Sequence, residues 1–181
     1  VVISVYELIE NPVKVFFVKS GEQVPCPCCD GDLKVIGSRR RHYINSLGDS
    51  VILMIRRMRC TTCCRIHHEL PDILIPYKRY SAESIESVLD KNSDLPIAAD
   101  DSTIWQWLQW FADKKDYLSG CLLSILHRYE PKTAEDLSTL PASPLPRIKY
   151  MVGAAPGWLA RVVRTVANCN LWPQTRSAFL S

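Results

Sequence analysis

The spacing of hydrophobic residues changes near residue 80, and this change predicts two structurally different halves. Before it, short runs rich in β-branched and aromatic residues, such as those at 13–19 and 33–37, are typical of strands. Two further runs, at 39–45 and 50–59, flank residues 46–49 (SLGD), which favour a tight turn and therefore a β-hairpin. Near its start the second arm is apolar at both alternating sets of positions, so we expect partial burial on both faces.

After residue 80 the hydrophobic residues recur at helical spacing. Ser81 is a suitable N-cap for a first helix, and a very short second helix is predicted at residues 97–99, with Pro96 in its first turn. A longer helix follows from Thr103, and a further helix follows that one. This order of elements indicates a helix-turn-helix. The expected core face of the longer helix consists of Ile104, Leu108 and Phe111.

The last part of the chain combines a proline-rich segment with an amphipathic one. Prolines interspersed with serine and threonine predict a linker with little regular structure at 130–157. Residues 158–168 (WLARVVRTVAN) predict a final helix, which either packs back onto the other helices or binds a partner. The expected fold class is therefore α+β. Its regions are a β-rich domain at 1–80, a helix-turn-helix domain with a following helix at 81–129, the linker at 130–157, and a C-terminal helix and tail at 158–181.

Two C-x-x-C pairs, Cys26 with Cys29 and Cys60 with Cys63, are the most specific chemical signal in the chain. Thirty residues separate the pairs, enough for the predicted hairpin to bring them together. Four thiolates around one Zn²⁺ form a closed tetrahedral site, which is typical of a structural rather than a catalytic ion. A hairpin between two such turns is the plan of a zinc ribbon, in which metal replaces much of a core too small to fold alone.

Other residues near the pairs leave alternatives open. Cys28 and Cys64 each adjoin a predicted ligand and would substitute for Cys29 or Cys63 if the turns were arranged differently. His67 and His68 follow the second pair closely and are further candidate ligands, although four thiolates already fill a zinc site. Disulfides, a redox site or an iron site are the remaining interpretations of these cysteines.

The N-terminal run VVISVYELIE bears on the cellular compartment. Glu7 and Glu10 stand where a signal peptide requires an unbroken apolar core, and no apolar stretch approaches the length of a membrane span. We therefore expect a cytoplasmic chain with reduced thiols and no membrane partner.

Positive charge is concentrated around the hairpin. Residues 34–79 contain ten Lys or Arg against three Asp or Glu, a formal charge of +7, whereas residues 80–181 contain ten basic and eleven acidic side chains. Some of this charge would offset a four-thiolate zinc site. The remainder is either a solvated charged face or a phosphate-contacting surface, and the clustering of the charge favours the phosphate-contacting surface. The expected contacts to the DNA backbone are Arg39, Arg40, Arg41, Arg56, Arg57, Lys78 and Arg79.

The longer helix supplies the expected base contacts, namely Thr103, Gln106 and Gln109. It differs from a typical recognition helix because it has no cation before Lys114. Its aromatic run WQWLQWF contains more rings than one helix face can bury. We expect these rings to pack against the following helix, with a dimer interface or a contact to another protein as alternatives.

Three segments of the chain resemble a known group of proteins: CPCCDGDLKVIGSRRR at 26–41, IRRMRCTTCCRIHHELPDILIPYKRYSAESIE at 55–86, and DDSTIWQWLQWF at 100–111. They resemble the zinc-binding and helix-turn-helix N-terminal regions of bacterial insertion-sequence transposases. The nearest resemblance is to an uncharacterised bacterial family of short transposase-like proteins without a catalytic domain.

This resemblance covers roughly residues 1–112. It implies that the four cysteines of the two pairs are metal ligands and that residues 102–111 form the recognition-helix region. The chain departs from the pattern at Cys28 and at Cys64, where a glycine is expected. Nothing after residue 112 resembles the acidic catalytic domain of those transposases, so strand transfer is not implied.

The expected function is a zinc-dependent DNA-binding protein of mobile-element type, associated with the nucleoid. Its expected partners are double-stranded DNA, a transposase or recombinase, and a second copy in a homodimer. We expect no enzymatic activity, because the sequence has no Gly-rich phosphate loop, nucleophile elbow or His-Glu-x-x-His motif. The alternatives are a protein-interaction module that docks a transposase, a polymerase or itself, a transcriptional regulator, and a thiol redox protein that uses Cys28 or Cys64.

Overall fold

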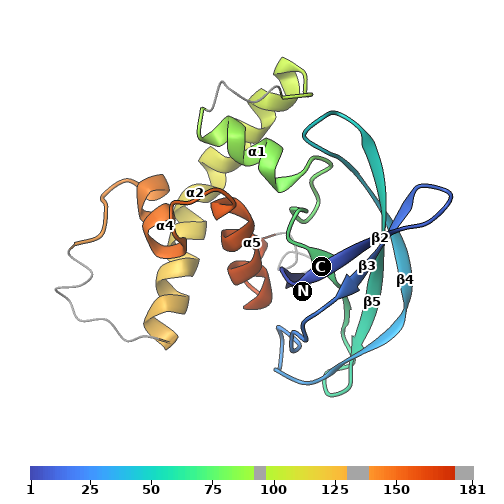
Figure 1. Ribbon diagram of the computed structural model, residues 1–181. Coiled ribbons are helices and arrows are strands. Elements are labelled where there is room, and N and C mark those ends of the chain that lie inside the picture. The colour runs from blue at the N-terminus through green and yellow to red at the C-terminus, as the bar shows by residue number, and fades with distance from the viewer. Residues whose placement is uncertain (92–96, 130–138, 174–181) are drawn as a thin grey trace.

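The computed structural model describes residues 1–91, 97–129 and 139–173 and has a mixed α+β architecture. A β-rich half comes first in the chain and the helices follow it (Figure 1). This confirms the predicted change from strands to helices near residue 80. The strands are β1 Val2–Ile3, β2 Tyr6–Glu10, β3 Val15–Ser20, β4 Leu33–Ile44, β5 Ser50–Cys60, β6 Ile66–His68 and β7 Leu70–Pro71.

The predicted hairpin is the centre of the main sheet. β4 and β5 pair antiparallel over their whole length, the strand order is β2-β3-β5-β4, and β6 also pairs with β5. The separate runs predicted at 33–37 and 39–45 join into one strand with a bulge between Val35 and Gly37, and the φ of 151° at Gly37 suits a glycine. β1 and β7 form a small parallel sheet.

The described helices are α1 Ala82–Leu89, α2 Asp101–Tyr129, α4 Pro144–Val152 and α5 Trp158–Asn168. Ser81 is the N-cap of α1, as predicted, because its side chain accepts a hydrogen bond from the Ser84 N–H. α5 has the predicted bounds and packs back onto the other helices, with Trp158, Leu159 and Val162 fully buried. None of the helices in the described part of the chain is long and apolar enough to cross a membrane.

Three predictions about the helical half are wrong. Residues 97–100 are not helical, so the short second helix does not form there; Pro96 lies outside the described residues. The longer helix and the following helix are one continuous helix, α2. The predicted linker contains a regular element, α4, because Pro144 suits the first turn of a helix and Ile148 can be buried against α2. Residues 130–138 of the predicted linker and the last eight residues of the predicted tail, 174–181, lie outside the described residues.

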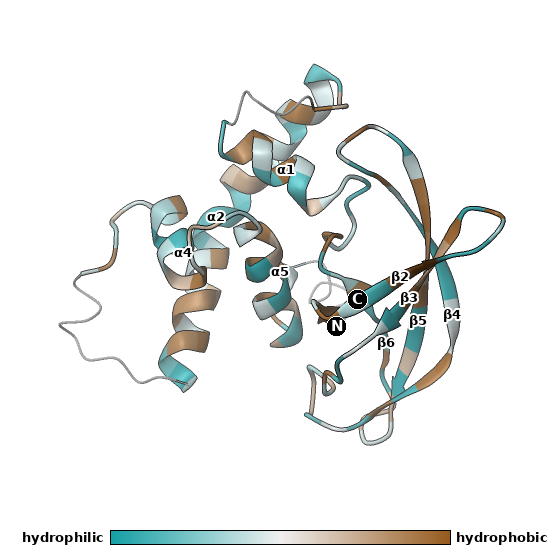
Figure 2. Cartoon of the chain, in the orientation of Figure 1, coloured by the Kyte–Doolittle hydropathy of each residue, from teal (hydrophilic) through white to brown (hydrophobic). Residues whose placement is uncertain are grey.

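The buried face of α2 also differs from the prediction. Trp107 and Phe111 are buried, but Leu108 is 40% exposed. The segment predicted as the following helix continues α2, and aromatic residues of α2 pack on other segments: Trp107 contacts Tyr80 edge-on, and Phe111 contacts Trp158 of α5. Hydrophobic and hydrophilic residues both occur along α1, α2 and α5, as expected of helices with one buried face (Figure 2).

Two hydrophobic cores lie on either side of the junction between the halves. The larger core is built mainly from the helices, whereas the core of the β-rich half has only six buried residues: Ile3, Val18, Tyr43, Leu53, Ile55 and Leu74. Within the helical half, the buried carboxylate of Glu86 in α1 accepts hydrogen bonds from the N–H groups of Gly157 and Leu159, which begin α5. The small second core implies that the β-rich half needs another source of stability.

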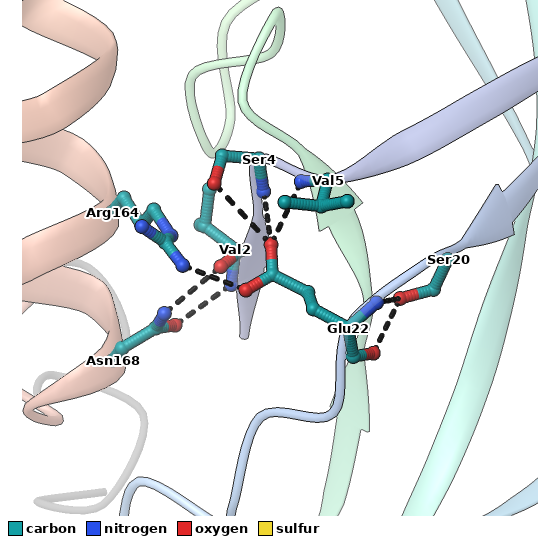
Figure 3. Close-up of polar contacts among 7 residues, drawn as sticks. All are labelled: Val2, Ser4, Val5, Ser20, Glu22, Arg164 and Asn168. Carbon is teal, nitrogen blue, oxygen red and sulfur yellow. Dashed lines mark hydrogen bonds and ion pairs between the residues drawn. The ribbon is translucent and has the colours of Figure 1, made fainter.

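α5 is joined to the β-rich half by polar contacts (Figure 3). Asn168 accepts a hydrogen bond from the Val2 N–H at 2.7 Å and donates one to the Val2 carbonyl at 2.8 Å. Arg164 pairs with Glu22 at 2.7 Å, and the same carboxylate accepts a hydrogen bond from the Val5 N–H. These bonds fix one face of α5 against the N-terminal segment, so both halves share a boundary at this helix.

Candidate metal centre and basic surface

The two C-x-x-C pairs come together at one end of the β4–β5 hairpin. Cys26 and Cys29 lie in the turn before β4, and Cys60 and Cys63 lie in the turn that ends β5. The four Sγ atoms are all within 4.8 Å of one another; Cys26 and Cys63 are 3.6 Å apart, and Cys29 and Cys60 are 3.5 Å apart. Sulfurs of a tetrahedral zinc site with Zn–S bonds of about 2.3 Å are about 3.8 Å apart. The four cysteines therefore fit one metal ion.

Backbone N–H groups of the two turns point at the sulfur atoms. The N–H groups of Thr62 and Cys63 lie 3.3 and 3.4 Å from Cys60 Sγ, and these bonds lower the pKa of that thiol to about 6. In contrast, burial raises the pKa of the Cys26 thiol. A thiol loses its proton when it binds a metal. A bound cation would therefore stabilise the Cys26 thiolate, which burial alone disfavours.

A second donor group adjoins the first and shares Cys26 with it. Cys26, Cys28 and His67 place one donor atom each within 4.8 Å of the others, and His67 Nε2 is 3.3 Å from Cys26 Sγ. Burial, the largest cause, and nearby cations lower the pKa of His67 to about 4, so its ring is neutral near pH 7. With Nε2 protonated the ring donates a hydrogen bond to the Cys26 sulfur; otherwise Nε2 is an additional candidate ligand. Of the alternatives named from sequence, Cys28 and His67 lie at the site.

Cys64 lies in the turn with a φ of 61°, a conformation that favours glycine. It is exposed and belongs to neither group of candidate ligands. The glycine expected there by resemblance thus matches a backbone requirement of the second turn.

We predict that Cys64→Gly keeps the metal and raises the free energy of unfolding by about 0.5–1 kcal/mol, because relief of the left-handed strain exceeds the added entropy of the unfolded chain. Cys64→Ala is the matched control, since it removes the sulfur but keeps the strain and should leave stability nearly unchanged. Chemical denaturation of the metal-loaded proteins measures both. Loss of metal from either variant would mean that Cys64 is a ligand after all.

The consecutive arginines of β4 do not share one face. Arg39 and Arg41 pair with Ile55 and Leu53 in the register of the hairpin, so they lie on the face that carries the smaller core, whereas Arg40 pairs with Met54 on the other face. Arg41 is half-buried and donates a hydrogen bond to the Lys78 carbonyl at 2.7 Å. The triplet therefore serves two different surfaces.

Two other predicted backbone contacts are held by internal partners. Arg56 makes a bidentate ion pair with the buried Glu69, with Nε and Nη2 at 2.6 and 2.7 Å from the carboxylate oxygens. The Lys78 ammonium lies 4.4 Å from the centre of the Trp110 ring on α2. Both cations thus have partners within the fold.

Sequence reasoning did not single out Lys34 and Arg59 as contacts, although both contribute to the charge excess of the hairpin. They are exposed and directly opposite each other across β4 and β5. Arg57 lies two residues before Arg59 in β5 and therefore on the same face, as does Arg39, the neighbour of Ile55. Strand alternation places these four cations on one face, but it can be applied across both strands only when the register of the hairpin is known.

The predicted base contacts lie on the first turns of α2. Gln106 and Gln109 are exposed, whereas the Thr103 N–H is bonded to the Asp100 carboxylate at the start of the helix. Trp105 is 61% exposed beside them. The exposed surface on the first turns of α2 therefore combines polar glutamines with a large apolar ring. Because the short helix is absent at 97–99 and α2 continues to Tyr129, the helix-turn-helix arrangement is not confirmed.

Comparison with known proteins adds one match. A family model described as a domain of unknown function (DUF6431) matches residues 26–107, which run from the first cysteine of the metal site into the first two turns of α2. No curated protein and no solved structure matches the chain. The matched segment contains all four cysteines, the whole hairpin and α1.

Proposed function

We propose that this chain is a DNA-binding protein in which one structural Zn²⁺ organises a basic β-hairpin, with a role in mobile-element biology or in transcription. Two findings support zinc as the ion: the donor set consists of thiolates alone, and two of the four cysteines are buried. The proposed site has no open position, so the chain is proposed to bind rather than to catalyse. In this role it would be associated with the nucleoid and would act beside a transposase or recombinase.

The observation that carries the proposal is a row of like charges on one face of the hairpin. Lys34 and Arg59 face each other directly across the strands, a pairing that destabilises a sheet by itself. Neither forms an ion pair with a described residue, and Arg57 and Arg39 extend the row. A surface with a row of cations that have no ion-pair partner among the described residues is suited to a polyanion such as the DNA backbone.

The expected result is that the full chain binds duplex DNA with an affinity that falls steeply as salt rises. Replacing both Lys34 and Arg59 by glutamine should reduce the slope of log K against log salt by about two, because each phosphate contact contributes about one. Fluorescence anisotropy with a labelled duplex at several salt concentrations measures this slope.

Lys14→Gln combined with Lys19→Gln is the charge-matched control, because both lysines are exposed and lie outside the hairpin, Lys14 just before β3 and Lys19 within it, where it pairs with Glu7. If the control lowers the slope as much as the hairpin variant, the binding follows net charge alone and the hairpin is not the DNA-contacting surface. Binding that does not respond to salt would contradict the proposal entirely.

The second candidate is a protein-interaction module, which the apolar surface of α2 favours. Trp105 and Leu108 are exposed on the same helix as Gln106 and Gln109. Exposed aromatic residues near apolar ones are typical of protein interfaces. A sizing measurement run beside the DNA titration separates the two functions: self-association without salt-dependent DNA binding supports the module, and the reverse supports the DNA-binding protein.

A further inference from the structure

A cavity of about 410 Å³ lies between the hairpin and the residues that follow α5. Arg39 and Arg41 line it from β4, His68 lines it from β6, and Tyr77 and Trp172 are also part of its wall. Of the row of cations described above, Arg39 lines the cavity, whereas Lys34, Arg57 and Arg59 do not. The cavity therefore adjoins one end of the row and shares only Arg39 with it.

The charge of this cavity is one-sided. Three arginines line it, and no Asp or Glu is among the lining residues that the structure describes. One of the three, Arg65, is hydrogen-bonded to the Cys28 sulfur and lies near Cys63 and Cys26, so it balances the thiolates of the metal site. Arg39 and Arg41 have no carboxylate partner within residues 1–91, 97–129 and 139–173. Their charges are left without a counterion.

The hydrogen bonding of Arg41 is a second sign that the cavity suits an anion. Its Nη2 atom donates to the Lys78 carbonyl, but its Nε atom is buried and has no hydrogen-bond partner among the described residues. Burial, followed by repulsion from Arg39 and Arg79, lowers the pKa of Arg41. A buried guanidinium donor without an acceptor is costly and uncommon in folded proteins. An anion in the cavity would remove both the repulsion and the unsatisfied donor.

We propose that this cavity binds a phosphate group, with Arg39 and Arg41 as its main ligands. Arginine suits this chemistry because its planar group presents several N–H donors to phosphate oxygens. His68 and Tyr77 supply further polar atoms to the same wall, and Trp172 offers an aromatic surface to whatever group carries the phosphate. The phosphate belongs either to nucleic acid or to a free phosphorylated small molecule. This inference shares Arg39 with the proposed DNA-contacting row but does not depend on Lys34, Arg57 or Arg59.

Titration of the metal-loaded full chain with inorganic phosphate, at constant ionic strength and followed by ³¹P line broadening, tests the proposal. The expected result is saturable binding that Arg39→Gln and Arg41→Gln each weaken by about tenfold or more, the effect of losing one charge-assisted hydrogen bond. Arg40→Gln is the matched control, because Arg40 is the intervening residue on the opposite face of β4 and should leave the affinity unchanged. Circular dichroism confirms that each variant is folded, and Arg41→Lys keeps the charge if Arg41→Gln does not fold.

Competition with a short duplex then identifies the source of the phosphate. Displacement of inorganic phosphate by the duplex assigns the site to nucleic acid, and unchanged phosphate binding in the presence of the duplex assigns it to a free phosphorylated ligand. Absence of saturable phosphate binding, or an equal loss in Arg40→Gln, would overturn the proposal. Since the Lys34 and Arg59 variant leaves the cavity intact, failure of the DNA-binding proposal and failure of this one give different results.

Discussion

Cys60→Ser is expected to abolish metal binding and to unfold the β-rich half of the chain while the helices remain folded. Cys60 is buried and is the last residue of β5. Its sulfur accepts hydrogen bonds from the backbone N–H groups of Thr62 and Cys63 in the turn that follows. The β-rich half has a core of only six buried residues, so we expect coordination of a metal to supply much of its stability. Binding of a structural Zn²⁺ is worth about 10–16 kcal/mol, which is comparable to the whole stability of a small domain.

The metal content of the purified protein, measured by mass spectrometry, should be one zinc per chain and should fall to near zero in Cys60→Ser. Far-UV circular dichroism should retain a helical spectrum, since the larger core is built mainly from α1, α2, α4 and α5. Hydrogen exchange should show loss of protection in β4 and β5. Cys64→Ser is the matched control, because its exposed side chain lies one residue from a ligand and belongs to neither candidate donor group.

Two outcomes would contradict this expectation. If Cys60→Ser kept its metal, Cys28 and His67, which share a donor group with Cys26, would form the true site. If it lost the metal but kept the protection of β4 and β5, the hairpin would fold without metal, and the ion would not be structural. A protein that retained its function after removal of zinc by a chelator would likewise favour the thiol redox interpretation.

The candidate metal site could be predicted from sequence because short, neighbouring stretches of the chain determine its geometry. A C-x-x-C turn brings its two sulfurs together by itself, and the hairpin at residues 33–60 needs only strand alternation and a turn signal to bring the two turns together. α5 was predictable for a similar reason: its apolar positions have one helical period, and the buried residues of the helix follow it.

The partners of the cations within the fold could not be predicted, because those partners lie on other segments of the chain. Arg56 is one of three arginines within four positions of β5, and only the fold shows that Glu69 on the neighbouring segment takes its charge. Likewise, Lys78 contacts a ring of α2 that lies 32 positions further along the chain. The sequence predicted two helices where α2 is continuous, and the buried Leu118 and Cys121 extend its buried face beyond the polar residues around Lys114 and Asp116.

Replacing one member of the Arg56–Glu69 pair should destabilise the fold, and the two replacements should differ in size. Glu69 is only 2% exposed, whereas the Arg56 side chain is 35% exposed. Arg56→Gln leaves a carboxylate buried without its cation and should cost about 3 kcal/mol; Glu69→Gln leaves a cation that reaches water and should cost about 1–2 kcal/mol. Denaturant unfolding of the metal-loaded proteins measures both values.

The combined variant Arg56→Met with Glu69→Leu is the control, because it removes both charges and should recover most of the loss. The same variants also decide what Arg56 does for binding. If Arg56 acts only within the fold, Arg56→Gln at a temperature where it is folded should leave the salt slope of DNA binding unchanged, in contrast to the loss expected for Lys34 and Arg59. A slope reduced by about one in Arg56→Gln would instead make Arg56 a phosphate contact, and the ion pair with Glu69 would then have to open when DNA binds.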